Sequence, residues 1–241
     1  MKALNIFLLL AFFSISQIAG ATEPTRNDQT SQQEERTVGS FKGIASGGSV
    51  MVMVTMGNKE TIRFEGDEEA IAQLITEVKN DVLIIRPKTK WNDWSRRYRD
   101  AKVTVYINAR KLNSLTMSGS GGITVSNTIN TTELVTTLSG SGGIKAATNC
   151  KSLVGVISGS GTLYINGKAD NANLTLSGSG SFFGKNFSAE QLSAQISGSA
   201  NVFINVKDNI EAVISGSGSI SYSGNPKIEK TIIGSGRIKK F

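Results

Sequence analysis

The chain has 241 residues and a formal net charge of +7, with 26 Lys and Arg against 19 Asp and Glu. It contains one cysteine, Cys150, and no histidine. A single cysteine excludes an intramolecular disulfide framework, and the absence of histidine removes the commonest acid–base catalyst and metal ligand. The positive charge favours anionic partners in general without selecting one.

The N-terminus carries the pattern of an export signal. Met1-Lys2 precedes an apolar run from Ile6 to Phe13, and Ala19-Gly20-Ala21 supplies the small residues of a cleavage site. We therefore expect a signal peptide over 1–21, followed by a polar, disordered leader over 22–40. The apolar run is short for a membrane anchor, and no later segment is long and apolar enough to span a bilayer. The expected location is the periplasm, the outer-membrane surface or the extracellular space.

Residues 41–110 are predicted to cap the repeat region that follows. Their short alternating runs, separated by turn residues, are typical of β-hairpins. Asp67, followed by acidic residues, predicts the N-cap of a short helix. The expected elements are a first hairpin from Ser49–Met56 and Thr61–Phe64, a helix within Asp67–Leu74, and a second hairpin from Ile75–Lys79 and Val82–Arg86.

The segment Lys88–Asp100 is the least repetitive part of the chain and holds both tryptophans. Guanidinium groups bind carboxylate, sulfate or phosphate in bidentate fashion, and flat aromatic rings stack on sugars. The segment therefore predicts a site for an anionic glycan or lipopolysaccharide head groups. The structural alternative is a solvated hairpin loop whose aromatic rings fold back onto the cap. The candidate ligand-binding residues are Trp91, Trp94, Arg96, Arg97, Tyr98 and Arg99.

The second half of the chain is a repeat array with a period near 20 residues, the mark of a repeat architecture. In each copy, alternating apolar residues flank a Gly-rich corner, which predicts two short strands meeting at a turn. A worn last copy reads Gly234-Ser235-Gly236. The Ser-Gly-Ser motif begins at Ser118, Ser139, Ser158, Ser177, Ser197 and Ser215.

One such unit cannot bury its apolar face alone, whereas parallel stacking places each strand about 4.8 Å from its copy in the next unit. The sequence thus favours an all-β solenoid, a parallel β-helix, over an antiparallel sandwich or a propeller, which prefer longer repeats and Asn-Gly hairpins. The expected interior ladders are Leu134, Leu153, Leu174, Leu192 and Ile210; Leu138, Ile157, Leu176, Ile196 and Ile214; and Ile123, Ile144, Leu163, Val202 and Ile220.

Two surfaces would follow from this stacking. The corner serines would form a row of hydroxyls. This row would either bind a repeating polymer or be present only because Ser and Gly fit a tight corner. Tyr164, Phe183 and Phe203 follow the corner in successive copies and would line one outer face. Such a stripe favours a component that binds protein partners, and its structural alternative is packing against the turns.

The sequence offers no catalytic constellation. β-Helix enzymes that act on pectin gather acidic residues on one face, as acid–base pairs or calcium ligands. Here the acidic residues of the array fall about once per repeat, and Asp208 and Glu211 are the only close pair. Serine has no histidine to activate it, and no helix and lysine follow the Gly-rich corners as in a phosphate loop. We therefore expect no catalytic residue, no metal and no cofactor.

The order of motifs resembles a known family. Phe41–Ile44 and Val50–Val54 are followed by Glu77–Ile85, Val103–Ile107 and Leu112–Gly121, where the Ser-Gly copies begin. This succession resembles the auto-transporter adhesin, head GIN domain family, a DUF2807-type domain found chiefly in Bacteroidetes. The resemblance implies a right-handed parallel β-helix-like fold and an exported, periplasmic or cell-surface protein. It implies no catalytic residues.

These observations together predict a non-catalytic exported binding or structural module, similar to an adhesin. Anionic glycan, lipopolysaccharide or envelope proteins are the expected partners, and nucleic acid is not expected because the chain is exported. The alternatives are a carbohydrate-active β-helix enzyme, a polysaccharide lyase or hydrolase, and an envelope protein-interaction or sensing component. The expected single domain covers 41–241, with the cap over 41–110 and the rungs over 111–241.

Overall fold

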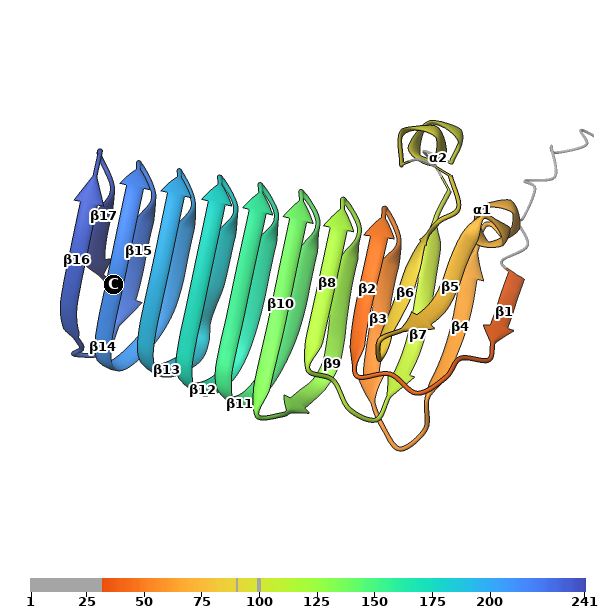
Figure 1. Cartoon of the computed structure of the whole chain (residues 1–241), viewed down its shortest axis with the longest axis horizontal. Coiled ribbons are helices and arrows are strands. Elements are labelled where there is room, and N and C mark those ends of the chain that lie inside the picture. The colour runs from red at the N-terminus through yellow and green to blue at the C-terminus, as the bar shows by residue number, and fades with distance from the viewer. Residues whose placement is uncertain (1–31, 90, 99–100) are drawn as a thin grey trace, which may run out of the picture.

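The structure is a computed structural model that describes residues 32–89, 91–98 and 101–241. The predicted signal peptide lies outside the described residues. The strands stack along a long rod, with the first elements at one end and the C-terminus at the other (Figure 1). The strands are β1 (Gln32–Arg36), β2 (Gly43–Gly48), β3 (Met51–Met56), β4 (Thr61–Gly66), β5 (Leu74–Lys79), β6 (Val82–Pro87), β7 (Val103–Ala109), β8 (Ser114–Gly119), β9 (Gly122–Asn130), β10 (Glu133–Gly140), β11 (Gly143–Gly159), β12 (Thr162–Gly178), β13 (Ser181–Gly198), β14 (Asn201–Gly216), β15 (Ser219–Ser223), β16 (Lys227–Ile233) and β17 (Arg237–Lys240), and the helices are α1 (Glu68–Ala72) and α2 (Trp91–Arg97).

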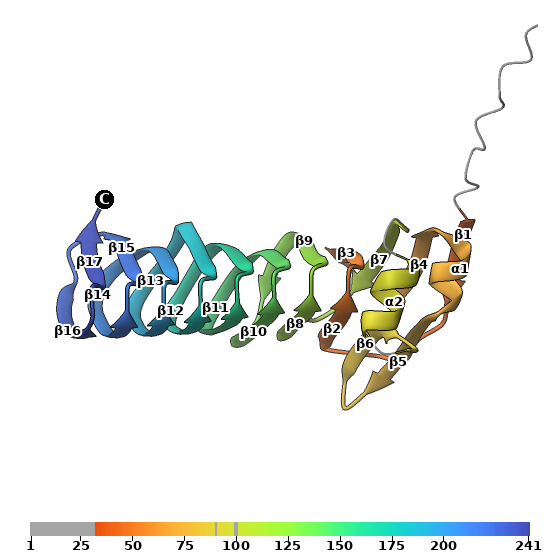
Figure 2. The same cartoon turned by 90° about the horizontal axis from the view of Figure 1, so that it is seen from above.

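Each rung of the array has two sides that meet at a Ser-Gly corner. One side, here called face A, consists of β8, β10, the second halves of β11 to β14, and β16. The other side, face B, consists of β9, the first halves of β11 to β14, β15 and β17. Every pairing between successive rungs is parallel, which confirms the predicted parallel β-solenoid (Figure 2).

The inward side chains form continuous apolar ladders, and two of the predicted ladders are confirmed: the one through Ile157 and the one through Leu163. The ladder through Leu134 differs from the prediction. Ala172, rather than Leu174, aligns with Leu153. Leu174 aligns with Gly155, whose missing side chain leaves it room: a Cβ added to Gly155 would lie 2.7 Å from Leu174 Cδ2. The alternation of apolar residues could not decide whether Ala172 or Leu174 aligns with Leu153, because both side chains point inward.

The corners depend on glycine because successive backbones approach closely there. Gly159 has φ +118°, a conformation that side chains rarely adopt. A Cβ on Gly159 would also lie 2.5 Å from the carbonyl oxygen of Gly140 in the previous rung. That same oxygen accepts hydrogen bonds from the backbone N–H groups of Ser160 (3.0 Å) and Gly161 (2.9 Å). The corner is thus a stack of backbone hydrogen bonds that leaves no space for a side chain.

The cap contains an additional rung that the repeat analysis missed. β2 pairs with β6 on one side and β8 on the other, and β3 pairs in the same way with β7 and β9. Gly47 and Gly48 align with Ser118 and Gly119, and Gly48 has φ +97°. This rung therefore has the same corner geometry as the array, with Gly47 in the position of the first serine. The first rung in the sequence lies inside the stack, between the cap strands and the array (Figure 1).

The predicted first hairpin is wrong, because β7 lies between β3 and β4. β7 is parallel to β3 and antiparallel to β4, and it buries Val103, Val105 and Ile107. The backbone N–H of Gly57, in the expected turn, donates instead to the carbonyl of Ala109 at the end of β7 (2.9 Å). β7, which is distant in sequence, thus provides β3 and β4 with the backbone hydrogen-bond partners that a hairpin would have provided.

The other predicted cap elements are confirmed. β5 and β6 form an antiparallel hairpin around Asn80 and Asp81, both at positive φ. This backbone conformation suits a two-residue hairpin turn. α1 begins after Asp67, whose carboxylate accepts a hydrogen bond from the N–H of Ala70 (2.8 Å).

β1 forms a strand inside the segment predicted to be a disordered leader. It pairs antiparallel with β4 and so covers an edge of the cap. Arg36 accounts for its position: the guanidinium donates to the carbonyls of Ile71 (3.0 Å) and Leu74 (2.9 Å) and lies 4.3 Å from the ring centroid of Phe64. The polar composition of β1 indicated disorder. Pairing with β4 and the contacts of Arg36 nevertheless hold the strand in place.

Candidate functional site

A single row of outward side chains runs along the rod on face B and its continuation in the cap. Each member is the strand-pairing partner of the next, and strand alternation places the row on the outer side of the strands. Every member is at least partly exposed except Ser221, which is 1% exposed. We call this row the axial row. In order along the rod it consists of Arg63, Tyr106, Met53, Thr124, Lys145, Tyr164, Phe183, Phe203, Ser221 and Lys239.

Three aromatic rings stack in the middle of the axial row. The ring centroids of Tyr164 and Phe183 are 5.2 Å apart with an interplanar angle of 11°, and those of Phe183 and Phe203 are 4.9 Å apart with an angle of 4°. Tyr164 is 46% exposed, while the two phenylalanines are half-buried. The prediction that these residues line one outer face is confirmed. Because the rings cover one another's faces, their edges form most of the exposed ridge.

Cations lie against aromatic rings at two places along the axial row. Lys185 Nζ is 5.5 Å from the ring centroid of Phe203 and 5.6 Å from that of Phe241. In the cap, the Arg63 guanidinium carbon is 4.5 Å from the ring centroid of Tyr106. Ammonium and guanidinium groups are attracted to aromatic faces at such distances. The charge of Lys185 is thus held next to aromatic surface, whereas Arg63 also pairs with Glu65 (3.3 Å).

The two faces of the array differ sharply in charge. From β9 onward, face B contains no Asp or Glu before the turn edge, where Asp170, Glu190 and Asp208 occupy equivalent positions. The strands of face A carry Glu133, Glu211 and Glu229. A surface with one sign of charge attracts oppositely charged ligands over distances comparable to the Debye length. Face B is therefore the anion-attracting side of the rod. Its basic residues are Lys145, Lys185, Arg237, Lys239 and Lys240, while Lys168 and Lys207 lie on the turn edge, where face B passes into face A.

The predicted basic-aromatic segment contains a helix, α2, rather than a loop. α2 stands away from the corner edge of the rod beside the cap (Figure 1). Trp94 is buried at 1% exposure, and its ring centroid is 5.6 Å from that of Tyr98, which packs partly against the core. The aromatic rings of Trp94 and Tyr98 thus fold back onto the cap, as the structural alternative expected.

The arginines of α2 remain accessible. Arg96 pairs with Asp93 (3.0 Å), and the Arg97 guanidinium carbon lies 5.7 Å from the ring centroid of Tyr98. The side chain of Trp91 and the whole of Arg99 lie outside the described residues. The structure therefore brings Trp94, Arg97 and Tyr98 together, but it presents only the arginines among these residues as exposed side chains. Binding by this segment stays a prediction.

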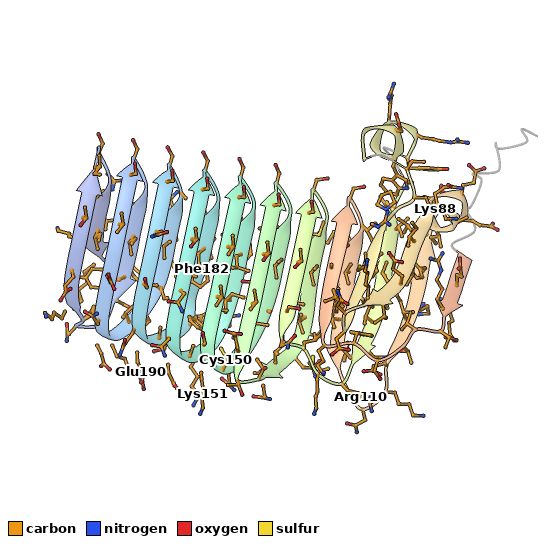
Figure 3. The ribbon with its side chains drawn as sticks, in the orientation of Figure 1. Lys88, Arg110, Cys150, Lys151, Phe182 and Glu190 are labelled. Carbon is orange, nitrogen blue, oxygen red and sulfur yellow. The ribbon has the colours of Figure 1, made fainter. Side chains whose placement is uncertain are left out.

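The turn edge of the array carries mixed charge. Asp170 and Glu190 occupy equivalent positions in adjacent rungs, and Lys151, Lys168 and Lys207 line the same open hollow of about 570 Å³ (Figure 3). Among the described residues, no group of three Cys, Asp or Glu side chains is placed to hold a metal ion.

Cys150 lines this hollow as a half-buried free thiol. Burial raises the pKa of the Cys150 thiol, and a hydrogen bond with Thr148 opposes that effect only in part. A thiol with a raised pKa is a poor nucleophile at neutral pH, because the thiolate is the reactive form.

A small charged cluster lies at the edge of the cap, near Arg110 (Figure 3). Ser40 Oγ donates to Glu60 (2.9 Å), and the Arg110 guanidinium contacts Glu60 (3.3 Å) and donates to Ser40 Oγ (3.1 Å). Burial raises the pKa of Glu60, but the hydrogen bonds from Ser40 and Arg110 outweigh it, so the pKa is lowered overall. This cluster ties the segment before β2 to the loop between β7 and β8.

The fold defines a parallel β-solenoid protein with a strand-and-helix cap. The family described as "Putative auto-transporter adhesin, head GIN domain" matches residues 40–226, which include the cap and most of the array. The chain belongs to this family. None of the curated proteins matches it.

Several solved structures resemble this chain in shape. A "putative adhesin" from Bacteroides fragilis NCTC 9343 has a TM-score of 0.77 and 23% identity, over 88% of this chain and 98% of its own. A "putative lipid binding protein" from Parabacteroides distasonis ATCC 8503 has a TM-score of 0.70 and 23% identity, over 89% and 98%. At these identities the likeness supports the fold alone. No helix in the described part of the chain is long and apolar enough to cross a membrane.

Proposed function

We propose that this chain is a non-catalytic, exported binding module of the cell envelope, and that face B is its binding surface. The observation that carries the proposal is the acid-free face B with its exposed aromatic ridge and flanking lysines. Large single-sign surfaces attract oppositely charged ligands, and exposed aromatic surface on a soluble protein commonly marks a binding site. The adhesin-type family supports the same conclusion.

The ligand class that fits this surface is anionic envelope material, either an anionic glycan or lipopolysaccharide. Lysine ammonium groups bind carboxylate, sulfate and phosphate as point charges, and such contacts weaken with salt. The related structure named for lipid binding supports including lipopolysaccharide among the probes.

The experiment is a glycan and lipopolysaccharide array with the chain that lacks the predicted signal peptide, run at low and at physiological salt. The test variant is Lys145→Gln/Lys185→Gln/Lys239→Gln on face B. The matched control removes the same charge elsewhere, as Lys59→Gln/Lys79→Gln/Lys111→Gln. We expect salt-sensitive binding that the test variant loses and the control retains. Equal binding by both variants, or no binding by the wild type, would contradict the proposal.

A second candidate is an envelope component that binds a protein partner through the same ridge. The stacked Tyr164, Phe183 and Phe203 favour it, because exposed aromatic side chains are enriched at protein interfaces. The two candidates respond differently to substitution. A protein interface would be weakened more by Tyr164→Ser than by the lysine variant and would change little with salt.

A further inference from the structure

The cations of the axial row are far apart, and every row member between them is at least partly exposed except Ser221. Lys145 and Lys239 belong to the row five strand steps apart, or roughly 24 Å at the usual strand spacing. Arg63 lies a further four steps from Lys145, about 19 Å. A monosaccharide or a single lipid head group cannot bridge such distances. A ligand that uses the whole row must therefore be extended and must lie parallel to the rod.

The aromatic ridge between these cations also favours an extended ligand. The ring faces are largely occupied by their neighbours in the stack, so a sugar cannot insert between the rings. The ring edges that remain carry partial positive charge and are complementary to anionic oxygen atoms. Lys185 beside Phe203 adds a full charge at one end of the ridge.

We propose that the axial row binds a linear polyanionic polysaccharide, which lies along the solenoid axis with successive acidic groups over successive rungs. This inference rests on the proposed function and specifies the shape and direction of the ligand. A pyranose unit in an extended polysaccharide has a length similar to the ~4.8 Å spacing of the rungs. A hexasaccharide then covers the six row positions from Lys145 to Lys239. The polyanion is assigned as the occupant because its acidic groups complement the lysines and the ring edges along the ridge.

A lipid bilayer suits this ridge less well. Insertion into the head-group region requires apolar side chains that protrude, as in interfacial amphipathic helices. Phe183 and Phe203 are half-buried and held in a stack, so they form a low ridge instead of anchors. Anionic vesicles therefore serve as the competing probe.

The test is a length series of oligogalacturonates, from the disaccharide to the octasaccharide, measured by titration calorimetry. We expect the affinity per molecule to rise steeply up to the hexasaccharide and to level off beyond it. Lys145→Gln/Lys239→Gln should weaken octasaccharide binding by about tenfold or more and flatten the length dependence. Lys168→Gln/Lys207→Gln removes the same charge from the turn edge, away from the axial row, and should change the affinity by less than about threefold.

The outcomes separate this inference from the proposed function. Equal affinity for short and long oligomers, or equal loss in both lysine variants, would overturn the axial mode and leave face B as an anion-binding surface. Binding to phosphatidylglycerol vesicles with none to the octasaccharide would overturn the polysaccharide as occupant. No binding to either probe or to lipopolysaccharide would overturn both proposals. Far-UV circular dichroism verifies that the exposed-lysine variants remain folded.

Discussion

The cap and the array both bury apolar strand faces by stacking strands, but they arrange those strands in different orders. In the array, each rung pairs with the rungs that precede and follow it in the sequence, so spatial order equals chain order. In the cap, β7 lies between β3 and β4, and the rung of β2 and β3 lies between β6 and β7 on one side and β8 and β9 on the other. Apart from the β5–β6 hairpin, chain order and spatial order differ in the cap.

This difference determines where each region obtains its stability. An array rung depends on close backbone contacts repeated at every corner, and each repeat contacts mainly its neighbours. The cap depends on a few large side chains and on contacts between segments distant in sequence, such as Arg36 with Leu74. We therefore expect backbone substitutions to be most damaging in the array and side-chain truncations to be most damaging in the cap.

The largest effect is expected for Trp94→Ala in the cap. Removal of a buried indole should cost about 3–5 kcal/mol of unfolding free energy, measured by chemical denaturation. Arg96→Gln/Arg97→Gln, on exposed positions of the same helix, should change it by less than about 0.5 kcal/mol. A Trp94→Ala variant of wild-type stability would mean that the indole is free for a ligand instead of packed in the cap.

Gly159→Val tests the corner of the array. Valine would adopt a strained φ and would collide with the carbonyl oxygen of Gly140, so we expect a loss of roughly 3 kcal/mol. The measurement is the melting temperature, with Ser158→Val as the exposed neighbouring control. Equal melting temperatures for Gly159→Val and wild type would refute the close-contact corner.

A smaller effect is expected where the array relies on side-chain size. The Cβ of Gly155→Ala would lie 2.7 Å from Leu174 Cδ2, and overpacking of this kind should cost about 1–2 kcal/mol. Leu174→Ala alone leaves a cavity and should cost about 2–4 kcal/mol. The double variant should be more stable than the sum of the single losses predicts, by about 1 kcal/mol. Strict additivity in denaturant unfolding would show that Gly155 and Leu174 do not face each other.

The smallest effect concerns pH and the cluster at Glu60. Because the pKa of Glu60 is lowered in the fold, its ionised form stabilises the folded state above the unfolded pKa, and this contribution is lost as pH falls through the folded pKa. The difference in melting temperature between wild type and Glu60→Gln should therefore shrink on acidification. Glu190→Gln, on the turn edge, provides the control. A difference that stays constant from neutral to acidic pH would argue against the Ser40–Glu60–Arg110 cluster.

The array could be predicted from the sequence because its pairing is local in the repeat. A fixed period and inward apolar alternation gave the solenoid, two of three ladders and the outer stripe of Tyr164, Phe183 and Phe203. The Leu174 register was missed because a small residue, Ala172, competes for the same ladder. Side-chain size in the neighbouring rung decides between them, and alternation does not encode it.

The cap and the binding surface were less accessible to sequence reasoning. The position of β7 depends on pairing with residues 37 to 53 positions earlier in the chain, and β1 is held by Arg36 rather than by apolar residues. The composition of the Lys88–Asp100 segment predicted a binding site, but Trp94 is part of the hydrophobic core. The lysines of face B are dispersed in the sequence, and only the strand register places Lys145 and Lys239 in one row. The relevant signal was the absence of acidic residues after each corner, which becomes visible once the copies are aligned.

The most direct test of face B as the binding surface is the affinity for polygalacturonate at low and physiological salt. The comparison is between wild type, Lys145→Gln/Lys185→Gln/Lys239→Gln and the control Lys59→Gln/Lys79→Gln/Lys111→Gln. We expect the face B variant to lose about tenfold or more in affinity and much of the salt dependence, while the control stays within about threefold of wild type. Equal losses in the two variants would show that net charge alone attracts the polymer and that face B is not a specific site.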